Sequence, residues 1–307
     1  MMNLFHKKDQ YQGYNIYSMK KYVDKKRIIF TTIIVILIII TLGFIIYYSV
    51  DTTIRLKNAK RFEQKLIEYE SKQEELQKQE RERQAKIPKL TDEGKQNIKG
   101  IYKSETKRVF LTFDDGPSVN TADVLDILKS NDIKATFFVL GTQVKKMPEM
   151  VKRAYQEGHY IANHGYSHQY SQIYSSPETV LQEFNQCNSA VAKAIDVPEY
   201  NSHLFRFPGG SVGGKYANLK AEAVTLLEQN NIMHVDWNAL TGDAEKSSPD
   251  EEYLMNNLQK TTQNKNSIVI LMHDAQAKRV TVEFLPKLIE FFQQQGYQFE
   301  NFYSIIK

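Results

Sequence analysis

The chain has 307 residues, of which 41% are hydrophobic and 25% charged, a composition that indicates a packed domain and excludes a disordered or fibrous chain. Its single cysteine, Cys187, excludes an intramolecular disulfide and a metal site built from several thiolates. The formal net charge is +4, but residues 1–27 alone carry +5, so the remainder is slightly negative and we expect no nucleic-acid partner.

Residues 28–50 form an apolar segment without a single charge. It ends in Tyr-Tyr-Ser-Val and is followed by Asp51. At about 1.5 Å of rise per residue, this segment is long enough to cross a bilayer, and it is longer and bulkier than the core of a signal peptide. We therefore predict a transmembrane helix. The Lys and Arg residues before it predict a cytoplasmic tail, residues 1–27, and an extracellular location for everything that follows.

Residues 51–100 are predicted to form a helical stalk and linker. Residues 52–86 are rich in Glu, Gln, Lys and Arg and lack Gly and Pro, and Pro88 should end the helix. Apolar side chains recur at a spacing near 3.5 residues, which could form a weak coiled-coil seam and allow self-association: Leu56, Ala59, Phe62, Leu66, Tyr69 and Leu76. Gln73, Glu80 and Arg83 continue the same seam, which favours a solvated spacer helix instead.

From residue 101 to residue 307, short apolar runs alternate with amphipathic segments. Strands are predicted at 108–113, 135–140, 160–163, 204–207, 233–237 and 267–272. Helices are predicted at 121–130, 148–157, 177–195, 220–230, 249–262 and 280–294, with an aromatic-rich segment at 297–303. This alternation predicts an α/β domain with a parallel sheet, either open or closed into a barrel. About 200 residues are too few for eight full units, so a barrel would be incomplete or distorted.

Unusual polar residues follow the predicted strands. They are Asp114 and Asp115, His164 and His168, Arg206, Asp243, and His273. Because the carboxyl ends of parallel strands meet on one face, we expect these side chains to converge there.

The acidic pair alone is equally consistent with a turn or a helix cap. The two histidines, four residues apart, are a stronger signal, because neighbouring neutral imidazoles commonly share a divalent metal. Two His and one Asp leave coordination positions for water and substrate, as hydrolysis requires. The set therefore predicts a catalytic metal site.

Four motifs occur in the order and spacing of the polysaccharide deacetylase family, also called the NodB homology domain. They are Thr112-Phe113-Asp114-Asp115-Gly116-Pro117, His164-x-x-x-His168, Arg206-Phe207-Pro208 and Leu271-Met272-His273. Residues 101–307 thus resemble this family, and within it the chain resembles membrane-anchored peptidoglycan N-acetylglucosamine deacetylases of Gram-positive bacteria. The resemblance implies a distorted (β/α) barrel that removes acetyl groups from a cell-wall glycan. It also implies one divalent metal, usually Zn²⁺, with Co²⁺, Ni²⁺ or Mn²⁺ as alternatives.

By this resemblance, Asp115, His164 and His168 would bind the metal and Asp114 would be the base. Arg206 would orient that base and keep it ionised, and His273 would be the acid. Hydrolysis of an amide independently requires an activated water and a proton donor for the leaving amine.

A carboxylate beside His273 would raise its pKa. Asp243 is expected in that place, with Asp236 as the alternative. The predicted substrate-binding residues are Leu271, which would face the acetyl methyl group or pack in the core, together with Phe207, Pro208 and Trp237.

Three positions depart from the family pattern. Gly165 stands where Ser or Thr is usual, Gly209 where an aromatic residue is usual, and Ala244 where a tryptophan is usual. The predicted metal and acid–base residues are all present, but sugar-contacting surface is lost, and Ser167 could replace the hydroxyl missing at Gly165. An exopolysaccharide or a chitin-like oligomer therefore stays open as a substrate, and so does a non-catalytic glycan-binding scaffold.

Overall fold

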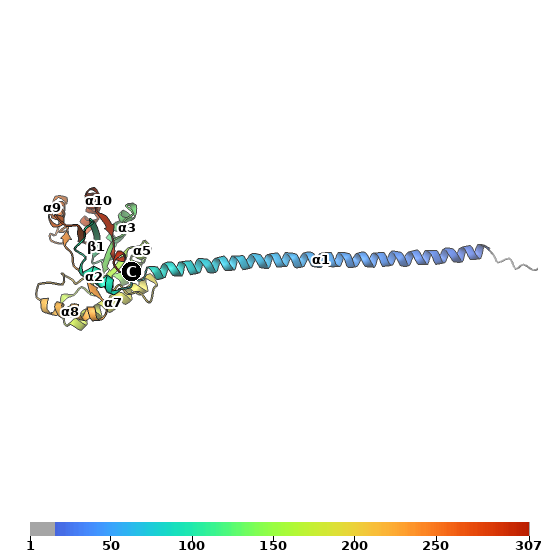
Figure 1. The fold of residues 1–307 in the computed structure, drawn as a ribbon, viewed down its shortest axis with the longest axis horizontal. Coiled ribbons are helices and arrows are strands. Elements are labelled where there is room, and N and C mark those ends of the chain that lie inside the picture. Colours follow the sequence, from blue (N-terminus) through green and yellow to red (C-terminus); the bar gives the residue numbers. More distant parts are fainter. Residues whose placement is uncertain (1–15, 307) are drawn as a thin grey trace, which may run out of the picture. The chain divides into compact units, whose positions relative to one another are not determined.

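The computed structural model describes residues 16–306, and its first element is a single long helix (Figure 1). Helix α1, Ile16–Ala85, runs without a break, so the predicted transmembrane segment and stalk form one helix. It is long and apolar enough to cross a membrane, and every side chain in residues 28–50 is exposed. It ends three residues before Pro88. Most of the predicted tail lies outside the described residues.

The other helices and strands belong to a second unit that begins at Glu80. Its strands are β1 (Arg108–Asp114), β2 (Thr136–Val139), β3 (Tyr160–Asn163), β4 (Leu204–Phe205), β5 (Met233–His234), β6 (Ala239–Leu240), β7 (Ser267–His273) and β8 (Gln298–Glu300). Its helices are α2 (Asp92–Lys99), α3 (Val119–Ser130), α4 (Gly141–Lys146), α5 (Pro148–Gln156), α6 (Tyr170–Ile173), α7 (Pro177–Ile195), α8 (Ala217–Gln229), α9 (Glu251–Thr262), α10 (Arg279–Gln294) and the 3₁₀ helix η1 (Phe302–Ser304).

The strands form one parallel sheet in the order β5-β4-β3-β2-β1-β7-β6, and β8 pairs with the first half of β1. Six steps of about 4.8 Å would separate the outer strands by about 29 Å if the sheet were flat. Only residues 235–238 connect β5 to β6, and a chain of that length reaches about 18 Å at most. The sheet must therefore curl until its two edges approach each other. This half-barrel confirms the predicted incomplete barrel.

The two faces of the curled sheet have different surroundings, because side chains alternate along a strand. On β1, Val109, Leu111 and Phe113 join the core between the sheet and the helices. Phe110 points to the inner face, where it packs against Phe302 of the C-terminal segment. Thr112 and Asp114 follow Phe110 on this inner face. The inside of the half-barrel is thus apolar toward the amino ends of the strands and polar at their carboxyl ends.

The structure corrects the predicted strand at 233–237. β5 stops at His234, and residues 235–238 cross to the opposite edge of the sheet to begin β6. An apolar run that crosses a half-barrel has the same composition as a strand, so the sequence pattern could not separate the two. Helix α2 was also not predicted, and its Ile98 packs on the inner face of the sheet.

Candidate functional site

Strand register brings the predicted catalytic residues together. β1 and β7 pair along their whole length, which places Asp114 opposite His273 and Thr112 opposite Leu271. On the other side of the half-barrel, Asn163 of β3 pairs with Phe205 of β4. The residues that follow the two strands, His164 and Arg206, therefore leave the sheet side by side. The resulting cluster lies at the carboxyl ends of the strands, as expected.

Asp115, His164 and His168 form a group that fits a metal ion. Oδ1 of Asp115 lies 3.6 Å from Nε2 of His164 and 3.4 Å from Nε2 of His168. One donor atom from each residue lies within 4.8 Å of the other two. Donors bound tetrahedrally at about 2.1 Å would lie about 3.4 Å apart. Oδ1 of Asp115 is buried without a hydrogen-bond partner among the described residues, so the site offers a lone pair that nothing else uses.

Asp115 reaches this group because β1 ends at Asp114, so the alternation of side chains between the two faces of the sheet does not continue to Asp115. In an extended backbone Asp114 and Asp115 would point to opposite faces, but Asp115 has a φ of 70°. This turn allows both carboxylates to face the same site.

His164 is held in the form that a metal requires. Its Nδ1 lies 2.8 Å from the carbonyl oxygen of Arg206, so Nδ1 carries the proton and Nε2 is left with its lone pair. Burial lowers the pKa of His164 to about 3, because charging the ring inside the protein is costly. The imidazole is therefore neutral across the physiological pH range.

The loop between the two histidines is fixed by Glu183, a buried residue of α7 that the sequence analysis did not single out. Its carboxylate accepts hydrogen bonds from the backbone N–H of Tyr166 and of Ser167, at 2.5 and 2.7 Å, and from the Ser167 hydroxyl at 2.7 Å. Gly165 has a φ of 89°, and a side chain there would meet Ile173 at 3.0 Å. Ser167 therefore supplies the hydroxyl contact that Gly165 cannot.

Asp114 and Arg206 form a buried ion pair with a distance of 2.9 Å between Oδ1 and Nη1. Arg206 is fully buried, donates also to Thr112 Oγ1 and to the carbonyl oxygens of Val235 and Asp236, and stacks on Phe138 with 3.9 Å to the ring centre. The other oxygen of Asp114 lies 3.7 Å from Nε2 of His164. Arg206 thus fixes the carboxylate so that one oxygen faces the metal-ligating group.

Burial raises the pKa of Asp114, and the opposing effects of Arg206 and His273 do not fully offset it. Arg206 lowers this pKa, which agrees with its expected role of keeping Asp114 ionised, but burial has the larger effect. A raised pKa makes the carboxylate a stronger base toward a water molecule.

His273 is paired with Asp243. Nδ1 of His273 lies 3.0 Å from Oδ1 of Asp243, whose Oδ2 accepts from the backbone N–H of His273 at 2.8 Å and from the Thr281 hydroxyl at 2.7 Å. Burial would lower the pKa of His273, but the bond and charge of Asp243 outweigh it and raise this pKa to about 9. The alternative residue, Asp236, instead binds Ser211 through its carboxylate.

A cavity of about 360 Å³ opens onto these residues, and Leu271 and Trp237, two of the predicted substrate-binding residues, line it. The prediction that Phe207 and Pro208 contact substrate is wrong. Phe207 is fully buried against Phe205, and Pro208 is buried, with its carbonyl accepting from Tyr174.

Tyr170 is a further cavity residue, and the sequence analysis missed it. Its hydroxyl lies 2.8 Å from where a side chain on Gly209 would begin. The aromatic surface missing at Gly209 is therefore replaced in space by Tyr170, whereas Ala244 leaves its part of the rim uncovered.

Comparison with known proteins places this geometry in a family. The family model described as polysaccharide deacetylase matches residues 102–226. A peptidoglycan-N-acetylglucosamine deacetylase of Bacillus cereus is 33% identical over 205 residues, which are 65% of this chain and 71% of that protein. A CE4 esterase of Streptococcus mutans superposes with a TM-score of 0.62 at 30% identity, covering 67% of this chain and 90% of that structure. The catalytic domain of a peptidoglycan N-acetylglucosamine deacetylase from Eubacterium rectale superposes with a TM-score of 0.59 at 31% identity, covering 65% and 90%. The chain belongs to the polysaccharide deacetylase family.

Proposed function

We propose that the protein is a metal-dependent hydrolase that removes N-acetyl groups from the N-acetylglucosamine residues of cell-wall peptidoglycan. The observation that carries the proposal is the register pairing of Asp114 with His273 beside a group of two His and one Asp. A purely glycan-binding protein would have no use for a buried base and a histidine with a raised pKa. The relatives named as peptidoglycan deacetylases support this substrate.

The residues divide the reaction between them. A divalent cation held by Asp115, His164 and His168 would supply a Lewis acid for the acetyl carbonyl. Asp114, held by Arg206, takes a proton from the attacking water. His273, kept protonated by Asp243, gives a proton to the leaving amine. Leu271 and Trp237 provide the apolar walls of the cavity against which the acetyl methyl group and the sugar can rest.

Zinc is the proposed metal. Imidazole and carboxylate donors at these separations suit a tetrahedral site with an open position, the usual arrangement of catalytic zinc. Co²⁺, Ni²⁺ and Mn²⁺ accept similar donors and are the alternatives to be compared.

The proposed location follows from α1. Its exposed apolar segment, residues 28–50, would be the single membrane span, with residues 1–27 in the cytoplasm and the deacetylase unit outside the cell membrane, facing the wall. Protease added to intact cells should remove the deacetylase unit and leave the N-terminal tail protected.

The substrate proposal is tested with the full chain in detergent, incubated with isolated peptidoglycan and with N-acetylglucosamine oligomers. Mass spectrometry should detect loss of acetyl groups from peptidoglycan, and the rate should fall on addition of a chelator. Absence of acetyl loss from every glycan would refute the enzymatic proposal. Loss from the neutral oligomers alone would refute peptidoglycan as the substrate.

A further inference from the structure

A second cavity lies on the other side of the metal-ligating residues. It has a volume of about 480 Å³ and shares Asp115 and His168 with the cavity that holds His273. These two residues therefore form a partition, with open space on both sides. We call the second space the outer cleft. A polymeric glycan whose acetamido group reaches the partition would have neighbouring sugars on either side of it.

The outer cleft has the surface that a sugar requires. Gln143, Gln276 and Thr142 bring hydrogen-bonding groups to it, and their side chains make no hydrogen bond with any residue that the structure describes. Val119 is 62% exposed at its edge, and Met147 contributes further apolar surface. Amides and a hydroxyl beside exposed apolar groups match the hydroxyls and the apolar face of a pyranose ring.

Lys146 is the single Lys or Arg that lines the outer cleft, and within the described part of the chain it forms no ion pair. It lies in the last turn of α4, where the helix dipole favours a basic residue. The dipole argument applies equally to Lys145, but the Lys145 ammonium lies 5.0 Å from the centre of the Tyr166 ring and lines a different hollow. The position of Lys146 in the cleft is therefore not explained by helix capping alone.

We propose that the outer cleft binds the sugar next to the one that is deacetylated, and that Lys146 binds a carboxylate attached to that neighbouring sugar. This inference rests on the proposed function and narrows its substrate to an acidic glycan. In peptidoglycan the carboxylate has two sources, the lactyl group of N-acetylmuramic acid and the stem peptide attached to it. Neutral chitin-like oligomers have neither.

The test compares Lys146→Gln with Lys145→Gln in the full chain in detergent, since both remove one charge from the same helical turn. The substrates are peptide-free glycan strands with free lactyl carboxylates, the same strands with methylated carboxylates, strands with stem peptides, and neutral N-acetylglucosamine oligomers. We expect Lys146→Gln to lower kcat/KM about two- to fivefold on the free-carboxylate strands, the range of an exposed ion pair, and to leave the methylated strands and neutral oligomers unchanged. Lys145→Gln should change none of them. A selective loss on peptide-bearing strands alone would assign the carboxylate to the stem peptide.

Equal loss on charged and methylated strands, or no loss on any acidic strand, would overturn the proposal. Binding separates this result from a failure of the proposed function. Calorimetry with Asp114→Asn, with and without Lys146→Gln, measures the affinity for the same strands without turnover. A weaker affinity for free-carboxylate strands only in the Lys146 variant supports the cleft even if no acetyl group is released, and equal affinities refute it.

Discussion

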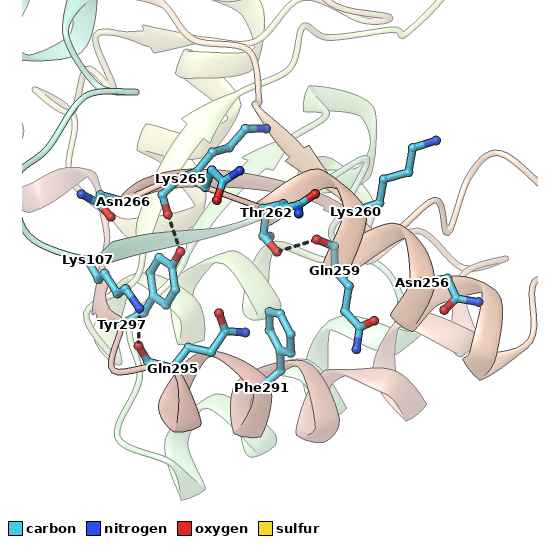
Figure 2. Close-up of a pocket in the computed structure, with 12 residues that line it drawn as sticks. Lys107, Asn256, Gln259, Lys260, Thr262, Lys265, Asn266, Phe291, Gln295 and Tyr297 are labelled. Carbon is cyan, nitrogen blue, oxygen red and sulfur yellow. Dashed lines mark hydrogen bonds between the residues drawn. The ribbon is translucent and has the colours of Figure 1, made fainter.

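The two ends of the half-barrel differ in a way that cavity size does not reveal. At the amino ends of the strands, the chain surrounds a hollow of about 820 Å³, more than twice the 360 Å³ of the candidate active site (Figure 2). Figure 2 shows its lining of amides, lysines and the aromatic rings of Phe291 and Tyr297. Several of its polar side chains bind backbone carbonyl groups of the fold. Lys107 donates to the carbonyl oxygen of Gln295 at the end of α10, and Lys265 donates to that of Thr261 near the end of α9.

The carboxyl ends of the strands contain buried charge instead. Asp114 is 2% exposed, Asp243 2%, and Arg206 not at all. Removing such groups from water is costly, and a buried ion pair seldom adds net stability. Their presence at one end of the sheet is therefore explained by a catalytic role and not by stability. The buried charged groups identify the candidate active site, whereas cavity volume alone would have selected the larger hollow.

Among substitutions that test this difference between the two ends of the half-barrel, Asp114→Asn is expected to cause the largest loss of activity. The amide keeps the shape of the side chain but cannot take a proton from water, so kcat should fall about 10²- to 10⁴-fold. Acetyl release from peptidoglycan measures the change, with metal content and circular dichroism as controls for folding. Activity within tenfold of the wild type would show that Asp114 is not the base.

Asp243→Asn should change the pH profile. His273 has a pKa raised from 6.5 to about 9, so in the wild type its protonated form is lost only as the pH rises through 9. Because His273 binds its proton more tightly in the folded state, protonation of His273 stabilises the fold. This contribution is complete below pH 6.5 and is lost as the pH rises through 9. Without the carboxylate, burial should bring this pKa to 6.5 or below. The alkaline limb of kcat/KM should move down by at least about two pH units. An unchanged limb would contradict the pairing.

The smallest effect is expected at the opposite end of the barrel. Lys260→Gln removes an exposed charge from the larger hollow without touching a buried group. Turnover of peptidoglycan should change less than about twofold, and the unfolding temperature should hardly move. A loss comparable to that of Asp243→Asn would indicate that the larger hollow contributes to activity.

The sequence pattern was sufficient to bring the predicted acid and base residues to one place, because their positions depend on local rules. Period-two alternation places Asp114 and His273 on the inner face, and parallel pairing brings their strand ends together. The residues whose roles depend on tertiary packing were harder to find. Phe207 follows Arg206 in a recognised motif, but alternation turns it into the core beside Phe205.

Glu183 and Tyr170 were missed for different reasons. Glu183 lies on the face of α7 that also carries Val180, Phe184 and Cys187, and an acidic residue on an otherwise buried helix face was a readable signal of a buried partner. Tyr170 gave no such signal. Its place beside Gly209 depends on how helix α6 packs against a loop that is distant in sequence, which no local pattern records.

The measurement that tests the central claim most directly is a metal titration of the full chain in detergent. After treatment with a chelator, acetyl release from peptidoglycan should be lost and should return with about one equivalent of Zn²⁺. The Asp115→Ala variant should neither bind that equivalent nor regain activity, because it lacks the carboxylate oxygen that lies beside both histidines. Full activity without metal, or recovery of Asp115→Ala to the wild-type level at the same zinc concentration, would contradict the account.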